Sequence, residues 1–188
     1  MIRIGILGDI GSGKTHISRN FGYPVFNADK EVEKLYKKNK KVFLKLKKVL
    51  PKFINSFPIN KNEIINAILA NDENLRKIIK IIHFEVRKEM KKFLRRNKNK
   101  RFIILDIPLL LENKINKKGD ILIFVKSKKK DILSRLKKRK NINYELLKKF
   151  KKIQLSLDYK IKKSNFIIKN NFTKKSVKRD IKYILRKI

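Results

Sequence analysis

The chain has 188 residues, a formal net charge of +37 and no cysteine. This length suits a single domain with at most a small inserted subdomain, and the lack of cysteine excludes disulfides and thiolate metal sites. The longest apolar run, residues 102–111, is interrupted by Asp106 and Pro108 and is too short to cross a membrane. We expect no signal peptide and a soluble, cytoplasmic protein.

The high positive charge has two interpretations. It could reflect nucleic-acid binding through phosphate contacts, or a genome biased towards A/T-rich codons, since Lys, Asn and Ile are abundant throughout. The basic residues are spread along the chain, and aromatic residues are not interleaved with them in a stacking pattern. We therefore favour codon bias and expect no specific nucleic-acid or membrane partner, although a positive field would attract anionic substrates.

A phosphate-binding loop follows the first predicted strand, residues 2–7. It has the pattern G-x-x-x-x-G-K-[ST] and consists of Gly8, Asp9, Ile10, Gly11, Ser12, Gly13, Lys14 and Thr15. In such a loop the glycines allow the backbone N–H groups to surround phosphate oxygens. Lys14 would reach the β- and γ-phosphates, and the Thr15 hydroxyl would bind Mg²⁺. The alternative is a glycine-rich turn that matches by chance.

Strand and helix patterns alternate along the rest of the chain. Further strands are predicted at 24–26, 102–107, 121–125 and 166–168. Helices are predicted at 30–49, at 61–95 with a break near Asn71-Asp72, and at 128–139, 143–160 and 174–187. This order predicts an α/β fold, with about five parallel strands between helical layers.

Two aspartates come at the ends of predicted strands, where open α/β sheets bind ligands. Asp29 could accept a proton from an attacking hydroxyl, or it could be the N-cap of a helix that begins at Lys30. Asp106 ends an apolar strand, as in a Walker-B motif, and would hold Mg²⁺. Its alternative role is that of an ordinary turn residue.

Two further pairs of residues each share one face of a predicted helix. Arg135 and Arg139 could supply charge to a transferring phosphoryl group, or belong to a solvated basic face. His83 and Arg87 could bind the phosphates of an acceptor, or His83 could simply pack beside Ile82.

Taken together, these residues resemble the dephospho-CoA kinase family over nearly the whole chain. The matching segments are 6–15 (LTGGIGSGKS in the family), 24–29 (a strand followed by DAD), 82–87 (HPxVR), 106–112 (DxPLLFE), 135–139 (RLxxR), Gln154 with Lys160 (Q-x5-K) and 166–170 (vIxN).

The resemblance implies ATP-dependent, Mg²⁺-requiring phosphorylation of the ribose 3′-hydroxyl of dephospho-CoA. It implies a three-layer P-loop core (1–30, 100–127 and 164–188), a helical acceptor-binding part (31–99) and a helical lid (128–163) in one domain, and we expect a monomer. Lys14, Asp29 and Arg139 would be catalytic, and Arg135 and Arg139 would bind ATP. His83, Arg87, Asp106 and Leu109, with Asp29, would bind the acceptor.

The chain departs from the family pattern at a few positions. Leu7 replaces a Thr, Asp9 replaces a Gly, Phe84 replaces a Pro, and Ser164-Asn165 replaces Ala-Asp. None of these changes removes a proposed phosphate, metal or base residue. The alternatives are another small P-loop nucleoside or nucleotide kinase and, in a different class, a nucleic-acid-associated P-loop ATPase.

Overall fold

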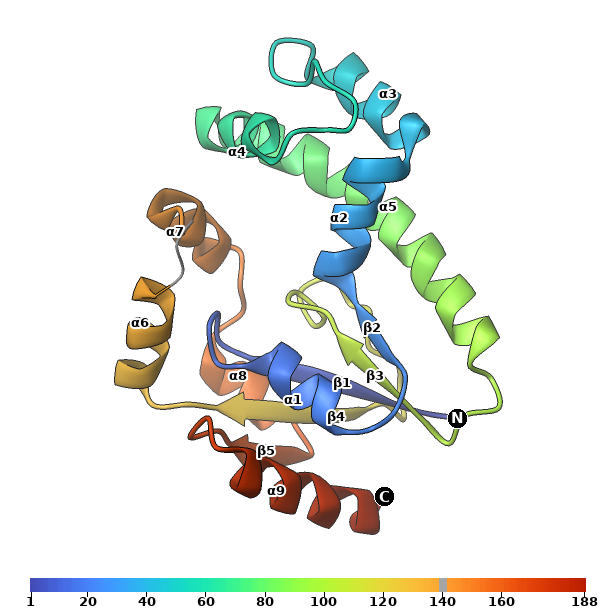
Figure 1. Cartoon of the computed structure of the whole chain (residues 1–188), viewed down its shortest axis with the longest axis vertical. Helices are drawn as coiled ribbons and strands as arrows, with labels where there is room; N and C mark the ends of the chain where they lie inside the picture. Colours follow the sequence, from blue (N-terminus) through green and yellow to red (C-terminus); the bar gives the residue numbers. More distant parts are fainter. Residues whose placement is uncertain (139–141) are drawn as a thin grey trace. The chain divides into compact units, whose positions relative to one another are not determined.

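The structure is a computed structural model that describes residues 1–138 and 142–188. The described part of the chain divides into two compact units, each traceable by colour in Figure 1. We call Met1–Asn27, Asn97–Asn143 and Lys149–Ile188 the core unit, and Ala28–Arg96 with Tyr144–Lys148 the helical unit.

The described residues of the core unit form a five-stranded parallel sheet in the order β2-β3-β1-β4-β5. Its strands are β1 (Ile2–Gly8), β2 (Val25–Asn27), β3 (Phe102–Asp106), β4 (Ile121–Lys126) and β5 (Phe166–Lys169). The central strands are continuous apolar runs, as expected where both faces of a parallel sheet are covered. The predicted α/β class and all five predicted strands are confirmed.

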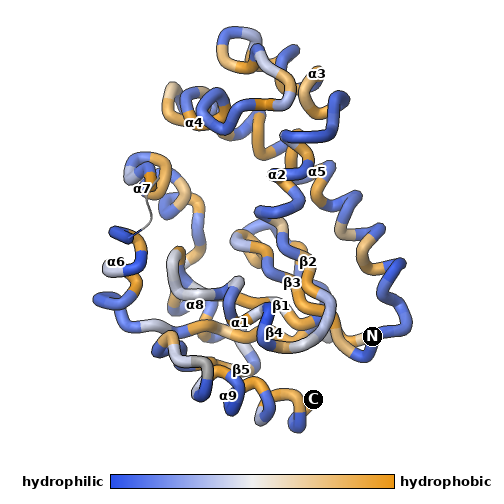
Figure 2. Tube along the Cα trace, viewed as in Figure 1, coloured by the Kyte–Doolittle hydropathy of each residue, from blue (hydrophilic) through white to orange (hydrophobic). Residues whose placement is uncertain are grey.

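Helices α1 (Lys14–Asn20) and α9 (Lys174–Lys187) cover one face of this sheet. Their apolar side chains form one core with alternate residues of the strands, and this core includes Ile4, Ile6, Ile17, Phe21, Phe102, Ile104, Ile123, Ile168, Val177 and Ile181. Figure 2 shows the strands as mainly hydrophobic and α9 as alternating along its length. On the other face Leu110 lies against Gly5, and α8 (Leu157–Lys162) contacts β1.

The order of the strands determines where a ligand can bind. From β1 the chain crosses to β2 and β3 on one side, and then returns past β1 to β4 and β5 on the other. In open parallel sheets such a reversal leaves a crevice beyond the carboxyl ends of the strands. The loops after β1, β3, β4 and β5 all emerge at this edge of the sheet.

The helical unit contains α2 (Ala28–Lys38), α3 (Lys40–Val49), α4 (Lys61–Ala70) and the long α5 (Asp72–Arg96). The other three helices all contact α5. Helix α7 (Tyr144–Lys152) contributes its first five residues to this unit, and α6 (Lys129–Lys137) belongs to the core unit. No helix among the described residues is long and apolar enough to cross a membrane.

Two predicted helices are each divided in the structure, because a polar side chain begins a new helix inside the apolar pattern. The predicted helix at 30–49 is α2 and α3, and Asn39 caps α3 by accepting a hydrogen bond from the Val42 N–H at 3.0 Å. The predicted helix at 143–160 is α7 and α8, with Ser156 as the cap of α8. The predicted break at Asn71-Asp72 is confirmed.

Candidate active site

The loop between β1 and α1 has a backbone that requires glycine at defined positions. Gly8 and Gly13 have φ angles of 144° and 92°, which side-chain-bearing residues rarely adopt. A Cβ on Gly8 would lie 2.7 Å from the carbonyl oxygen of Val125, and one on Gly13 would lie 2.5 Å from Asn170 Nδ2. The glycines of the motif are therefore needed for both conformation and close packing.

Lys14 folds back over the loop that precedes it. Its Nζ donates hydrogen bonds to the carbonyl oxygens of Gly8 at 3.1 Å and of Asp9 at 2.8 Å. The ammonium group is thus held beside the backbone N–H groups of the loop, where it can meet an anionic ligand. Thr15 is the next residue of α1. The phosphate-binding role of Lys14 and the metal-binding role of Thr15 remain predictions.

The side chain of Asp9 lies along the same loop. The side-chain Oδ1 accepts a hydrogen bond from the Ile10 N–H at 2.7 Å, and the backbone carbonyl oxygen of Asp9 accepts one from the Ser12 N–H at 3.2 Å. The carboxylate at this position is therefore engaged with the loop's own backbone.

Asp106 lies at the end of β3, beside the end of β2. The register pairs Asn27 with Asp106, and Asn27 Nδ2 donates a hydrogen bond to Asp106 Oδ2. Only 2% of Asp106 is exposed, and a buried carboxylate needs such a donor. Asn27 was not predicted as a site residue, although its place directly before Ala28-Asp29 at a strand end is the signal that could have identified it.

Asp29 lies in the first turn of α2, in the helical unit, and is exposed. Because α2 begins at Ala28, Asp29 is inside the helix and is not the N-cap of a helix that begins at Lys30. That alternative is wrong. The role of Asp29 as a base remains a prediction.

Helix α6 lies beside the phosphate-binding loop. Its buried residues Ile132 and Leu136 closely approach Gly11, where an added Cβ would meet them at 3.1–3.3 Å. Arg135 on the same helix is exposed, and its guanidinium Cζ lies 4.2 Å from the centre of the Phe172 ring. Arg139, its predicted partner, lies outside the described residues.

His83 and Arg87 share one face of α5, as the sequence spacing predicts. Burial lowers the pKa of His83 below its ordinary value of 6.5, and the charge of Arg87 lowers that pKa further. His83 is therefore neutral at pH 7, whereas Arg87 is exposed. The structure brings the two residues together, and their binding role remains a prediction.

The segment after β3 is fixed by a buried ion pair. Glu112 Oε1 lies 2.8 Å from Lys160 Nζ and also accepts the Leu155 N–H at 3.0 Å. Lys160, of which 1% is exposed, also donates to Gln154 Oε1 at 3.4 Å. The structure thus joins two segments that the sequence singled out separately. Leu109, in the same turn as Glu112, is half-buried.

The candidate metal ligands are the hydroxyl of Thr15, in α1, and the carboxylate of Asp106, at the end of β3. The described residues contain no group of three or more His, Cys, Asp or Glu side chains that could hold a metal ion.

The parallel sheet, the glycine loop after its central strand and the aspartate that ends the neighbouring strand define a P-loop nucleotide-binding protein. A family model described as dephospho-CoA kinase matches residues 2–176. The chain belongs to the dephospho-CoA kinase family, which confirms the resemblance seen in its sequence.

One relative in this family illustrates the similarity. The dephospho-CoA kinase of Wolbachia sp. subsp. Brugia malayi is 34% identical over 127 residues, which cover 65% of this chain and 65% of that protein. The match thus spans just under two thirds of that relative.

Solved structures show the same fold. A protein of Thermus thermophilus aligns with a TM-score of 0.79 and 24% identity, covering 100% of this chain and 97% of its own. The dephospho-CoA kinase from Campylobacter jejuni aligns with a TM-score of 0.65 and 21% identity, covering 98% and 96%.

Proposed function

We propose that this protein transfers the γ-phosphoryl group of ATP to the ribose 3′-hydroxyl of dephospho-CoA, giving CoA and ADP. The observation that carries the proposal is the loop geometry of the core unit, in which Lys14 lies over the glycine loop of a chain that belongs to this family. The buried Asp106 on the neighbouring strand supplies a second element of such a site.

The core unit is assigned to the nucleotide. The backbone of residues 8–15 would surround the phosphates, and the Lys14 ammonium would neutralise charge that grows on the γ-phosphoryl group during transfer. Arg135, on the helix that packs beside Gly11, would add a planar group suited to phosphate oxygens. Arg139 and the rest of 128–163 are proposed to form a lid.

The residues present fit a Mg²⁺ ion. Mg²⁺ prefers oxygen ligands and usually combines one or two protein groups with substrate phosphates. The hydroxyl of Thr15, at the start of α1, and the carboxylate of Asp106, at the end of β3, are such groups. When bound, the ion would neutralise charge on the phosphates.

Asp29 is assigned the role of general base. It would accept the proton of the ribose 3′-hydroxyl as the oxygen bonds to the γ-phosphorus, while the bond from that phosphorus to the β–γ bridging oxygen breaks and ADP leaves. Asp29 follows Asn27 by two residues along the chain, and Asn27 contacts Asp106 directly.

The acceptor is assigned mainly to the helical unit. Arg87 is exposed and permanently charged, so it can bind a phosphate group, and the neutral His83 can donate or accept a hydrogen bond beside it. Asp106 and Leu109 of the core unit complete the proposed acceptor-binding residues.

A panel of acceptors tests this function. The purified protein is incubated with ATP, Mg²⁺ and, in turn, dephospho-CoA, adenosine, a nucleoside monophosphate and shikimate, and the products are analysed by mass spectrometry. We expect phosphate on dephospho-CoA. Transfer only to a nucleoside or a nucleotide, or ATP hydrolysis that requires DNA or RNA, would contradict the proposal.

A further inference from the structure

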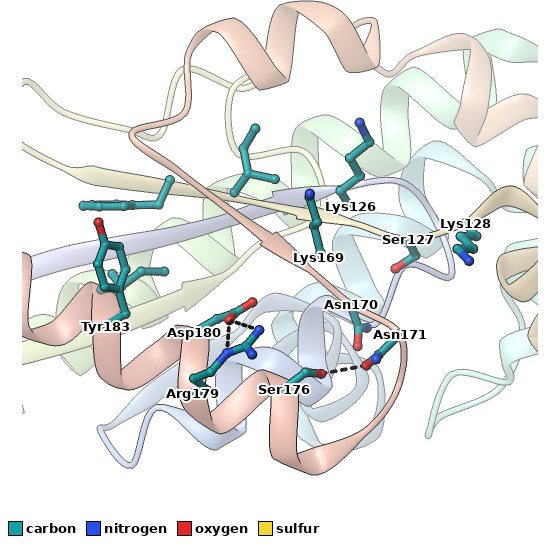
Figure 3. Close-up of a pocket in the computed structure, with 13 residues that line it drawn as sticks. Lys126, Ser127, Lys128, Lys169, Asn170, Asn171, Ser176, Arg179, Asp180 and Tyr183 are labelled. Carbon is teal, nitrogen blue, oxygen red and sulfur yellow. Dashed lines mark hydrogen bonds and ion pairs between the residues drawn. The ribbon is translucent and has the colours of Figure 1, made fainter.

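The carbonyl group of Ser12, in the middle of the phosphate-binding loop, accepts hydrogen bonds from two side chains that directly follow other strands of the sheet. Ser127 Oγ donates to this oxygen at 2.9 Å, and Asn170 Nδ2 donates to it at 2.8 Å. Ser127 directly follows β4, and Asn170 directly follows β5. Figure 3 shows both side chains at the end of the pocket along β5 and α9 that lies opposite Tyr183.

These hydrogen bonds determine the direction of a neighbouring N–H group. The Ser12 carbonyl and the Gly13 N–H belong to one planar peptide unit, and in a trans peptide they point in opposite directions. Holding the carbonyl towards Ser127 and Asn170 therefore turns the Gly13 N–H away from them. Without this constraint the peptide unit could rotate, because glycine tolerates a wide range of φ and ψ.

Asn170 is fixed in the orientation that this role requires. Only 3% of it is exposed, and its Oδ1 accepts the Phe172 N–H at 2.9 Å. Because the amide oxygen faces an N–H and the amide nitrogen faces a carbonyl, the opposite amide orientation would be repulsive on both sides. The side chain also closely approaches Gly13, where even a Cβ would meet it at 2.5 Å.

We propose that Asn170 is a positioning residue of the phosphate-binding loop: its amide fixes the Ser12–Gly13 peptide so that the Gly13 N–H can donate to a phosphate oxygen. Ser127 has the same role with a weaker hold, because it is only half-buried. The inference rests on the proposed function only in so far as the loop binds the phosphates of ATP.

The same strand provides a matched control. Asn165 lies just before β5, and its Oδ1 accepts the Leu122 N–H at 2.8 Å. An aspartate in its place could still accept that hydrogen bond. At position 170 an aspartate could still accept the Phe172 N–H, but it could not donate to Ser12 and would place a negative oxygen against the carbonyl. The same exchange should therefore disturb the loop at position 170 and leave it unchanged at position 165.

The test measures ATP binding by calorimetry with wild type, Asn170→Asp and Asn165→Asp, without any acceptor. We expect Asn170→Asp to weaken ATP binding by about 10- to 100-fold, because the Ser12 carbonyl loses one of its two donors and then faces a negatively charged oxygen. Asn165→Asp should stay within about twofold of wild type, as is usual for substitutions that remove no contact. Circular dichroism checks that each variant is folded under the conditions of the titration.

Ser127→Ala removes the second hydrogen bond to the Ser12 carbonyl and provides an independent test of the inference. It should weaken ATP binding by a smaller factor, and its effect should not add to that of Asn170→Asp, because both side chains act on one carbonyl. Wild-type affinity in a folded Asn170→Asp, or an equal loss in Asn165→Asp, would overturn the inference. If Asn170→Asp does not fold, wild-type affinity in Ser127→Ala would overturn it. Since the readout is ATP binding, failure to phosphorylate dephospho-CoA would contradict the proposed function alone.

Discussion

The two units of the molecule position their polar groups in different ways. In the core unit, buried contacts join residues far apart in the chain: Arg3 pairs with Asp120 at 2.9 Å, and Glu112 pairs with Lys160 at 2.8 Å. In the described residues of the helical unit, most ion pairs join residues three or four positions apart on one helix, and a pair such as Lys37 with Glu33 is well exposed.

This difference has an energetic consequence. Exposed pairs within a helix contribute about 0.3–0.5 kcal/mol each, whereas removing one partner of a buried pair costs about 3–5 kcal/mol. The buried pairs of the core unit therefore contribute more to fixing its geometry than the exposed pairs contribute in the helical unit. In the helical unit, His83 and Arg87 share one face of α5 because they are four residues apart. We propose that ATP binds mainly to the core unit and the acceptor mainly to the helical unit.

The largest expected effect is that of Lys14→Ala. This variant should abolish phosphoryl transfer and leave the fold intact, because the Lys14 ammonium lies at the carbonyl oxygens of the loop and would act on charge in the transition state. Turnover with saturating ATP and dephospho-CoA measures the loss. Near-normal turnover in a folded variant would remove the loop from the mechanism.

Asp29→Asn tests whether chemistry in the core unit depends on a residue of the helical unit. Loss of a general base should lower turnover by about 10²–10⁴-fold, while ATP affinity changes little. Because Asp29 lies in the first turn of α2, the lost charge should also cost about 0.3–1 kcal/mol of helix stability.

Both the turnover and the melting temperature of Asp29→Asn must be measured, because they separate a catalytic role of Asp29 from a role in helix stability. Full activity with a lowered melting temperature would show that Asp29 serves the helix and that the base is another residue.

Thr15→Val preserves the shape of α1 and deletes the hydroxyl proposed to bind Mg²⁺. We expect the Mg²⁺ concentration for half-maximal activity to rise by at least about 10-fold, since even outer-sphere partners of metals contribute about 10- to 100-fold in affinity. An Mg²⁺ titration that overlays that of wild type would show that Thr15 is only a helix residue.

The smallest expected effect concerns His83 and pH. Burial lowers the pKa of His83 in the folded protein, so acid protonates the unfolded chain more readily than the folded one. The stability of wild type should therefore fall as pH decreases through about 6.5. In His83→Gln this part of the pH dependence should be absent, as measured by urea unfolding at pH 7.5 and pH 5.5. An identical pH dependence in the two proteins would show that His83 is not perturbed.

Features that depend on local sequence were predicted in both units, with one exception. The strands and the glycine loop were predictable, because apolar runs and the motif are local signals, and the spacing of His83 and Arg87 correctly placed them on one helix face. The break at Asn39 was missed, because the apolar pattern continues through it and only the side-chain cap ends it.

Long-range contacts could not be predicted from local sequence patterns. The hydrogen bond from Asn27 to Asp106 depends on the pairing of β2 with β3. The hold on Ser12 by Ser127 and Asn170 depends on the order of β4 and β5 in the sheet. No spacing in the sequence specifies either arrangement.

The most direct test of the division between the two units is the double variant His83→Ala/Arg87→Ala, assayed with ATP and dephospho-CoA varied separately. Both changes lie on α5 in the helical unit, so the account predicts that KM for dephospho-CoA rises by about 10-fold or more, as expected for lost charge-assisted hydrogen bonds. The dissociation constant for ATP should remain that of wild type. An unchanged KM for dephospho-CoA, or an equal loss of ATP affinity, would contradict the account.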